Sequence, residues 1–154
     1  MKNVNENYEI PNQIIGEIAD DTRENLKAAS ELGKEFMFQT LMDYGSELGD
    51  FPDEEKNDEN LIHGCQSTVY ISAENKDGRI FYKGFSDSKL VQGEVAILLR
   101  IFDGQKAHDI INRSKEHLDK LVEETDIISS LSPSRQNAFG SMYEHIKEKA
   151  SQLS

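Results

Sequence analysis

Apolar residues recur at helical spacing in the first third of the chain. Residues 1–11, rich in Asn and Glu and ended by Pro11, are expected to form a flexible tail, and a helix is predicted from Asn12. Its apolar face comprises Ile14, Ile15, Ile18 and Ala19, with Leu26 continuing it. Gly33 is predicted to end this helix, because glycine disfavours helical backbone. A second helix is predicted over 35–48.

The pattern changes to a period of two from Val69. The residues expected on one face are Val69, Ile71 and Ala73, and those on the other are Tyr70, Ser72 and Glu74. Lys76-Asp77-Gly78 predicts a hairpin turn, because Asp-Gly accepts positive φ angles. The return strand is expected over 80–85.

Helical periodicity returns after Ser86-Asp87-Ser88, which is suited to cap a helix. The apolar stripe of that helix comprises Val91, Val95, Leu98, Leu99 and Phe102. Two short helices are expected over 106–113 and 114–124. Ser132 fits an N-cap and Pro133 the first position of a last helix. The apolar side of the last helix comprises Phe139, Met142, Tyr143, Ile146 and Ala150.

A long acidic segment, residues 49–63, separates the second predicted helix from the hairpin. It has no apolar periodicity, and loops of this length in compact domains are usually functional or mobile. A third strand is compatible with this region or its surroundings, although no hydrophobic periodicity indicates its position. The order of helices, hairpin and helices predicts the α+β class, with a small antiparallel sheet packed against helices on one face.

Composition narrows the class of protein. The chain has 154 residues, of which 36% are hydrophobic and 30% charged, so a single domain is expected over 12–154. No apolar run approaches the length of a membrane span. The N-terminus lacks the apolar core of a signal peptide, and the cytoplasm is the expected location.

The net charge of −12 argues against a nucleic-acid partner, because phosphate binding requires clustered Lys and Arg. It disfavours anionic membranes for the same reason. Solubility is the simplest interpretation of the acidity. A complementary basic surface on a protein partner is the alternative.

Cys65 is the single cysteine of the chain, and this limits its chemistry. One thiol cannot form an internal disulfide, a zinc site built from cysteines or an iron–sulfur cluster held by this chain alone. No metal and no cofactor are therefore predicted. Gly64 and Gln66 flank the thiol and favour an accessible position over a core position.

Three interpretations of Cys65 follow from the residues. A lone cysteine is often a buried, inert side chain. A nucleophile with His63 as its base is a second interpretation. The third is a thiolate that attacks the outer sulfur of a persulfide on another protein, which requires only one sulfur on this chain.

Three segments together resemble the SufE/CsdE family of sulfur-acceptor proteins in iron–sulfur cluster biogenesis. They are IHGCQSTVY over 62–70, SDSKLVQG over 86–93 and LSPSRQN over 131–137. The resemblance runs from about Phe36 to about Ala150. It implies an α+β fold similar to the IscU/NifU scaffolds.

The resemblance also implies a function. A cysteine desulfurase of the SufS or CsdA type, which carries its own pyridoxal phosphate, would supply persulfide sulfur to the chain. The chain would stimulate that desulfurase and pass sulfur to a SufB-containing scaffold. It would therefore be a carrier and activator without independent turnover, and a homodimer is left open. An IscU-type scaffold and a structural adaptor with an inert cysteine are the alternatives.

Site residues follow from the same resemblance. Cys65 matches the sulfur-accepting cysteine at the tip of a loop, flanked by Gly64 and Gln66. Arg135 would lie near this loop or the partner surface, and Asp87 at the start of the helix that shelters it. The simpler alternatives are an exposed first-turn arginine and a plain helix cap. His63 stands where Pro or Gln is usual, and it either tunes the thiol or faces water.

Overall fold

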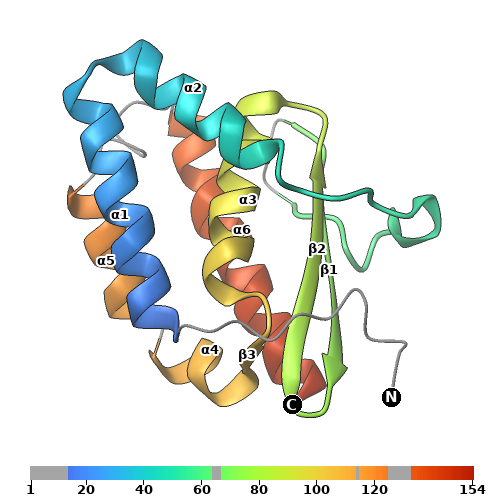
Figure 1. Cartoon of the computed structure of the whole chain (residues 1–154). Coiled ribbons are helices and arrows are strands. Elements are labelled where there is room, and N and C mark those ends of the chain that lie inside the picture. The colour runs from blue at the N-terminus through green and yellow to red at the C-terminus, as the bar shows by residue number, and fades with distance from the viewer. Residues whose placement is uncertain (1–13, 64–66, 114, 125–132) are drawn as a thin grey trace.

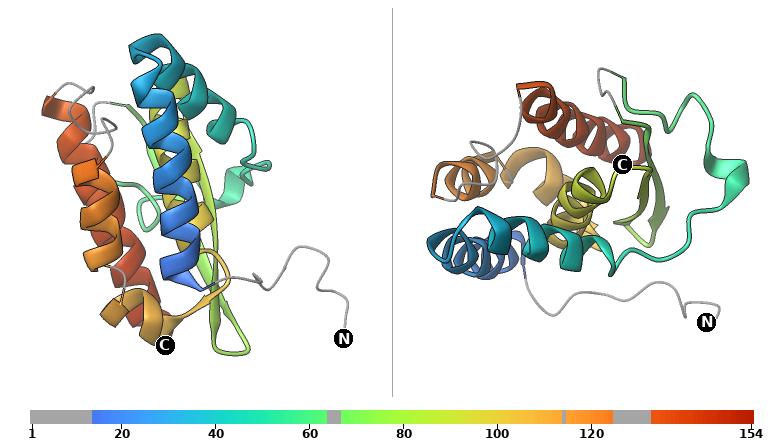
Figure 2. Two further views of the ribbon diagram at one scale, coloured as in Figure 1. Left: turned by 60° about the vertical axis from the view of Figure 1, so that its left-hand side comes forward. Right: turned by 90° about the horizontal axis from the view of Figure 1, so that it is seen from above.

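The computed structural model describes residues 14–63, 67–113, 115–124 and 133–154. Its helices are α1 (Ile15–Glu31), α2 (Lys34–Gly45), the 3-10 helix η1 (Asp53–Glu55), α3 (Lys89–Phe102), α4 (Ala107–Arg113), α5 (Lys115–Glu124) and α6 (Pro133–Leu153). Its strands are β1 (Val69–Lys76), β2 (Arg79–Ser86) and β3 (Gln105–Lys106). The α-helices lie on one face of the sheet, and residues 46–63, which include η1, lie on the other (Figures 1 and 2). This confirms the predicted α+β class.

The predicted hairpin forms the sheet. β1 and β2 pair antiparallel, with Tyr70 opposite Phe85 and Lys76 opposite Arg79. Asp77 and Gly78 have φ angles of 56° and 86°, which a tight two-residue turn between twisted strands requires.

The third strand is not in the acidic segment 49–63. β3 follows α3 directly and pairs antiparallel with the start of β2, at Arg79 and Ile80. The acidic segment contributes only an isolated bridge, between Leu61 and Tyr70. Two residues are too few to produce a period of two, so the sequence pattern could not indicate β3.

Helix α3 lies at the centre of the molecule, between the sheet and the helices α1 and α2. Its buried residues extend beyond the predicted stripe to Gly93, Glu94, Ala96, Ile97 and Ile101. A helix buried on nearly all sides is expected when other elements pack all round it. The side chain of Ser88 caps α3 by accepting a hydrogen bond from the Val91 amide at 3.4 Å.

Helix α2 ends at Gly45, three residues before the predicted end at Leu48. Helix α2 contacts α3 where Gly45 faces Gly93. The backbones of the two helices approach so closely there that a Cβ on Gly93 would overlap the carbonyl oxygen of Leu41. The break between α1 and α2 falls at Gly33, as predicted, with a φ angle of 119°.

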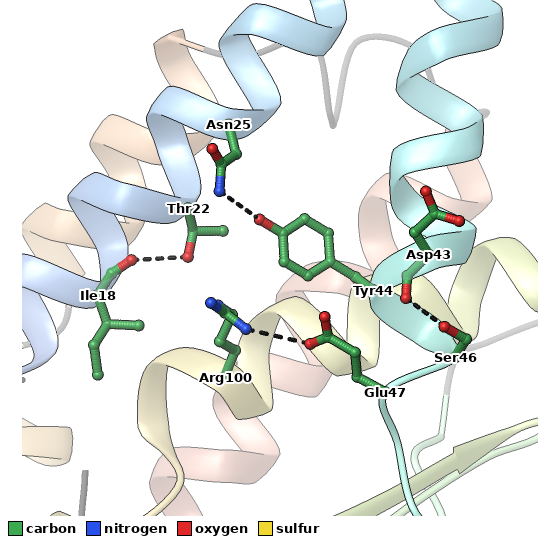
Figure 3. A network of polar contacts seen from close by, with 8 residues as sticks. All are labelled: Ile18, Thr22, Asn25, Asp43, Tyr44, Ser46, Glu47 and Arg100. Carbon is green, nitrogen blue, oxygen red and sulfur yellow. Dashed lines mark hydrogen bonds and ion pairs between the residues drawn. The ribbon is translucent and has the colours of Figure 1, made fainter. Parts of the chain in front are cut away.

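Polar contacts join α1, α2 and α3 around Tyr44 (Figure 3). The Asn25 amide donates to the Tyr44 hydroxyl at 3.3 Å, and the Arg100 guanidinium lies 5.6 Å from the Tyr44 ring centroid. Arg100 also pairs with Glu47 at 3.2 Å. Ile14, predicted on the apolar face of the first helix, is 65% exposed because it precedes the first helical turn.

Aromatic side chains cover the outer face of the hairpin. Phe51, from the acidic segment, lies 6.0 Å from Tyr70 and 6.3 Å from Phe85 between ring centroids. The ammonium of Lys56 lies 4.2 Å from the Phe85 centroid. The acidic segment is therefore packed against the sheet along part of its length.

Helix α6 packs against β1 and closes the core on the side away from α2. All the residues predicted for its apolar side are buried: Phe139, Met142, Tyr143, Ile146 and Ala150. The expected tail over 1–11 and the N-cap at Ser132 lie outside the described residues.

Candidate functional site

The segment that contains Cys65 begins and ends at a pair of hydrogen-bonded strand positions. The Ile62 amide donates to the Val69 carbonyl at 2.9 Å, and the Ile71 amide donates to the Asn60 carbonyl at 2.9 Å. Residues 60–62 thus run alongside the start of β1, and the six residues 63–68 connect the two. Gly64, Cys65 and Gln66 lie outside the described residues. The structure therefore describes only the two ends of this segment, which we call the cysteine segment.

The downstream end of this segment is held by Asp87. The Thr68 amide donates to Oδ1 of Asp87 at 3.1 Å, and the Asp87 amide donates to the Thr68 carbonyl at 3.3 Å. The cap of α3 is made by the next residue, Ser88. Asp87 therefore contacts the cysteine segment directly, because its carboxylate accepts the hydrogen bond from Thr68 and does not cap α3.

His63 is exposed at the upstream end of the segment. It lines a surface pocket of about 420 Å³ between residues 58–63 and α6, together with His145, Glu148 and Lys149. A second hollow of about 720 Å³ continues along α6 past Tyr143 to Gly140. A groove therefore begins beside the cysteine segment and follows α6.

His145 connects α6 to the strand that follows the cysteine. Its Nε2 lies 3.0 Å from the Ile71 carbonyl, and because a carbonyl only accepts, Nε2 carries the proton. Burial lowers the pKa of His145, while the hydrogen bond to Ile71 acts in the opposite direction. The neutral ring is thus favoured in this position.

Arg135 lies in the first turn of α6, and its side chain is outside the described part of the structure. Among the predicted site residues, His63 and Asp87 are placed at opposite ends of the cysteine segment. Three residues that contact this region were not identified from sequence: Asn60, His145 and Lys149. Each is a single polar residue without a motif, and only the tertiary structure brings them together.

The described residues contain neither a candidate metal centre nor a helix that could span a membrane. No group of three or more His, Cys, Asp or Glu side chains in these ranges could hold a metal ion. None of the helices there is long and apolar enough to cross a membrane.

The fold and the site define a class: an α+β protein with one thiol in a short segment between paired strand positions. The family model described as "SufE: Fe-S metabolism associated domain" matches residues 20–150. An uncharacterized SufE-like protein of Synechocystis sp. (strain ATCC 27184 / PCC 6803 / Kazusa) is 34% identical over 113 residues. These residues make up 73% of this chain and 69% of that protein. The chain belongs to the SufE family.

A structural comparison agrees on the fold. The solution structure of a hypothetical protein from Thermus thermophilus matches with a TM-score of 0.71 and 14% sequence identity. The match covers 94% of this chain and 98% of that one. At this identity the likeness concerns the fold alone. Membership of the SufE family implies a role in sulfur transfer for iron–sulfur metabolism, in contact with a cysteine desulfurase.

Proposed function

We propose that the chain accepts persulfide sulfur on Cys65 from a cysteine desulfurase of the SufS or CsdA type. In this proposal the protein stimulates the desulfurase and then passes sulfur to a SufB-containing scaffold. It acts in the cytoplasm through one SufE-like domain over 12–154. It catalyses no reaction by itself in this proposal, because the desulfurase binds the pyridoxal phosphate and L-cysteine is the substrate of that enzyme.

The transfer is a thiol–disulfide type exchange. The Cys65 thiolate attacks the outer sulfur of the desulfurase persulfide, and a new S–S bond forms on Cys65. The S–S bond on the desulfurase breaks, and its cysteine leaves as a thiolate. No electron acceptor is needed, because the sulfane sulfur moves without a change in the total redox state.

The observation that supports this proposal most strongly is the position of the only cysteine in a SufE-family chain. It lies in a six-residue connection whose ends are fixed by the pairs Ile62–Val69 and Thr68–Asp87. Such an arrangement holds the base of the segment while the thiol reaches a partner's active site. In this account Asp87 positions the segment, while Gly64, which has no side chain, and the polar Gln66 favour an accessible thiol.

Arg135 and His63 have subordinate roles in this proposal. Arg135, at the start of α6, would contact the cysteine segment or the partner surface. His63 is exposed and precedes Cys65 by two residues, so we propose that it contacts solvent in the free protein and the desulfurase in the complex.

The stimulation of sulfide release tests the proposal. The desulfurase is assayed with L-cysteine and a thiol reductant, with and without this protein. We expect the unchanged protein to increase the rate of sulfide release and Cys65→Ser to lose that effect. Full stimulation by Cys65→Ser would show that the protein does not carry sulfur on this residue.

A further inference from the structure

Asn60 is buried, and all of its polar groups are used. Its amide N–H lies 3.1 Å from the Asn57 carbonyl and 3.2 Å from the Asn57 side-chain oxygen, and its carbonyl accepts from the Ile71 amide. Its Nδ2 donates to the Glu55 carbonyl at 2.8 Å. Its Oδ1 accepts from the ammonium of Lys149 at 2.9 Å. One side chain thus links the acidic segment and α6, while its backbone pairs with β1.

Lys149 and His145 lie one turn apart on α6 and contact the two chain segments at the base of the cysteine segment. Lys149 donates to Asn60, which precedes the cysteine segment, and His145 donates to Ile71 of β1, which follows it. Asn60 and Ile71 are themselves paired. Helix α6 therefore contacts residues 60–62 and β1 at the same level, two residues away from the last hydrogen-bonded pair, Ile62–Val69.

We propose that Lys149 and Asn60 are positioning residues for sulfur transfer. They hold residues 60–62 against α6 and so set where the segment 63–68 delivers its thiol. This inference rests on the proposed function of Cys65. Asp87, which lies between β2 and α3, holds the downstream end, and Lys149 supplies the side-chain contact of the upstream end with a helix.

The physical reason is the burial of Asn60. Without the ammonium, its Oδ1 would lack a donor in a place with little access to water, so the bonded arrangement would become less favourable. The contact of residues 60–62 with α6 would open more often, and the thiol would spend less time in a geometry suited to attack. Small displacements of a reacting group can reduce a rate by a large factor.

The test compares three substitutions on α6. Lys149→Met removes the donor and keeps the aliphatic stem, while Lys149→Arg keeps a donor. Lys147→Met is the matched control: it removes a lysine two residues away whose ammonium lies over Tyr143 and near Glu144. Both sites are on the same helix, and Met and Arg are good helix formers.

The first readout is hydrogen exchange of the Ile62 and Ile71 amides in the free protein. We expect about tenfold faster exchange in Lys149→Met, corresponding to one lost hydrogen bond, and no change in Lys147→Met. Lys149→Arg is expected to restore slow exchange. Unchanged exchange in Lys149→Met would overturn the proposed contact.

The second readout is the rate of sulfur transfer from the desulfurase persulfide to Cys65 at increasing protein concentration. We expect the maximal rate to fall about tenfold in Lys149→Met. The concentration at half-maximal rate should stay the same, and Lys149→Arg should recover most of the rate. Faster exchange with an unchanged maximal rate would overturn the positioning role alone. Absence of sulfur on Cys65 of the unchanged protein would overturn the proposed function as well.

Discussion

Asp87 and Ser88 are neighbours in the chain but stabilise different parts of it. The Asp87 carboxylate accepts from the Thr68 amide, beside the cysteine segment, whereas the Ser88 hydroxyl accepts from the Val91 amide and caps α3. The family resemblance implied that Asp87 lies at the start of the helix that shelters the loop, with a plain helix cap as the alternative, but the capping side chain is that of Ser88.

This division of roles can be tested by exchanging each residue for alanine. Asp87→Ala is expected to speed hydrogen exchange at Thr68, because that amide loses its acceptor. Ser88→Ala is expected to lower the free energy of unfolding by about 1 kcal/mol, as loss of an N-cap does, without affecting Thr68. Exchange measured by NMR and urea unfolding would separate the two. Equal effects of both substitutions on Thr68 would contradict this assignment.

Asp103 follows α3 and is partly buried beside β2. Its Oδ1 accepts from the Tyr82 amide at 2.7 Å, yet burial raises the pKa of the carboxyl to about 6 from 3.8. The folded protein therefore binds this proton more tightly than the unfolded chain does. Binding of this proton by Asp103 contributes to the free energy of unfolding. The contribution is complete below about pH 4 and is lost as the pH rises through about 6.

Asp103→Asn should remove this pH dependence, because the amide is neutral and still offers an oxygen to Tyr82. We expect the free energy of unfolding of the variant, relative to the unchanged protein, to rise by about 2 kcal/mol between pH 4 and pH 7.5. Asp53→Asn is the control, since the Asp53 side chain is 94% exposed. If the difference in the free energy of unfolding between Asp103→Asn and the unchanged protein did not change with pH, the raised pKa of Asp103 would be contradicted.

At the scale of the elements, the contact between α2 and α3 depends on the absence of side chains. A Cβ on Gly93 would overlap the Leu41 carbonyl, which belongs to the backbone and cannot rotate away. We expect Gly93→Ala to lower the free energy of unfolding by about 2 kcal/mol or more, as overpacking does. Urea unfolding at constant pH measures this loss.

Gly140→Ala is the matched control for that substitution. Gly140 lies in α6, is exposed, and has no neighbouring atom of the described structure within 4 Å of the added Cβ. Replacing a helical glycine in open space should raise the free energy of unfolding by about 0.5–1 kcal/mol. If Gly93→Ala were as harmless as Gly140→Ala, the close approach of α2 and α3 would be wrong.

Elements with a long, regular pattern were predictable from the sequence. The hairpin was predicted by its alternation and by Asp77-Gly78, and the apolar side of α6 by five regularly spaced residues. β3 was not, because its two residues form a strand only through pairing with β2. The packing of Phe51 against the sheet also arises from tertiary contact and has no periodic signal.

The candidate site shows the same difference. The number of cysteines limited the chemistry, the neighbours of Cys65 favoured an accessible thiol, and the resemblance to the SufE family implied its role. The contact of Asn60 with Lys149 joins residues that are 89 positions apart in the sequence. The contact of His145 with Ile71 joins residues that are 74 positions apart. Polar pairs of this kind leave no local pattern, so their part in holding the cysteine segment could be found only in the structure.

At the scale of the whole molecule, the helices cover one face of the sheet and the acidic segment the other, and the cysteine segment begins where that acidic segment ends (Figure 1). Several of the acidic residues that precede it are exposed, among them Asp58 and Glu59. A net charge of −12 and these exposed carboxylates keep both interpretations of the acidity open, solubility and a complementary basic surface on a partner. The second interpretation fits delivery of the thiol to another protein.

The most direct test of the central claim is the intact mass of the protein after incubation with a cysteine desulfurase and L-cysteine. We predict that the mass rises by one sulfur atom, that a thiol reductant removes it, and that Cys65→Ser shows no gain. A protein that stays at its original mass while the desulfurase holds its persulfide would contradict the claim, as would a gain of the same sulfur by Cys65→Ser.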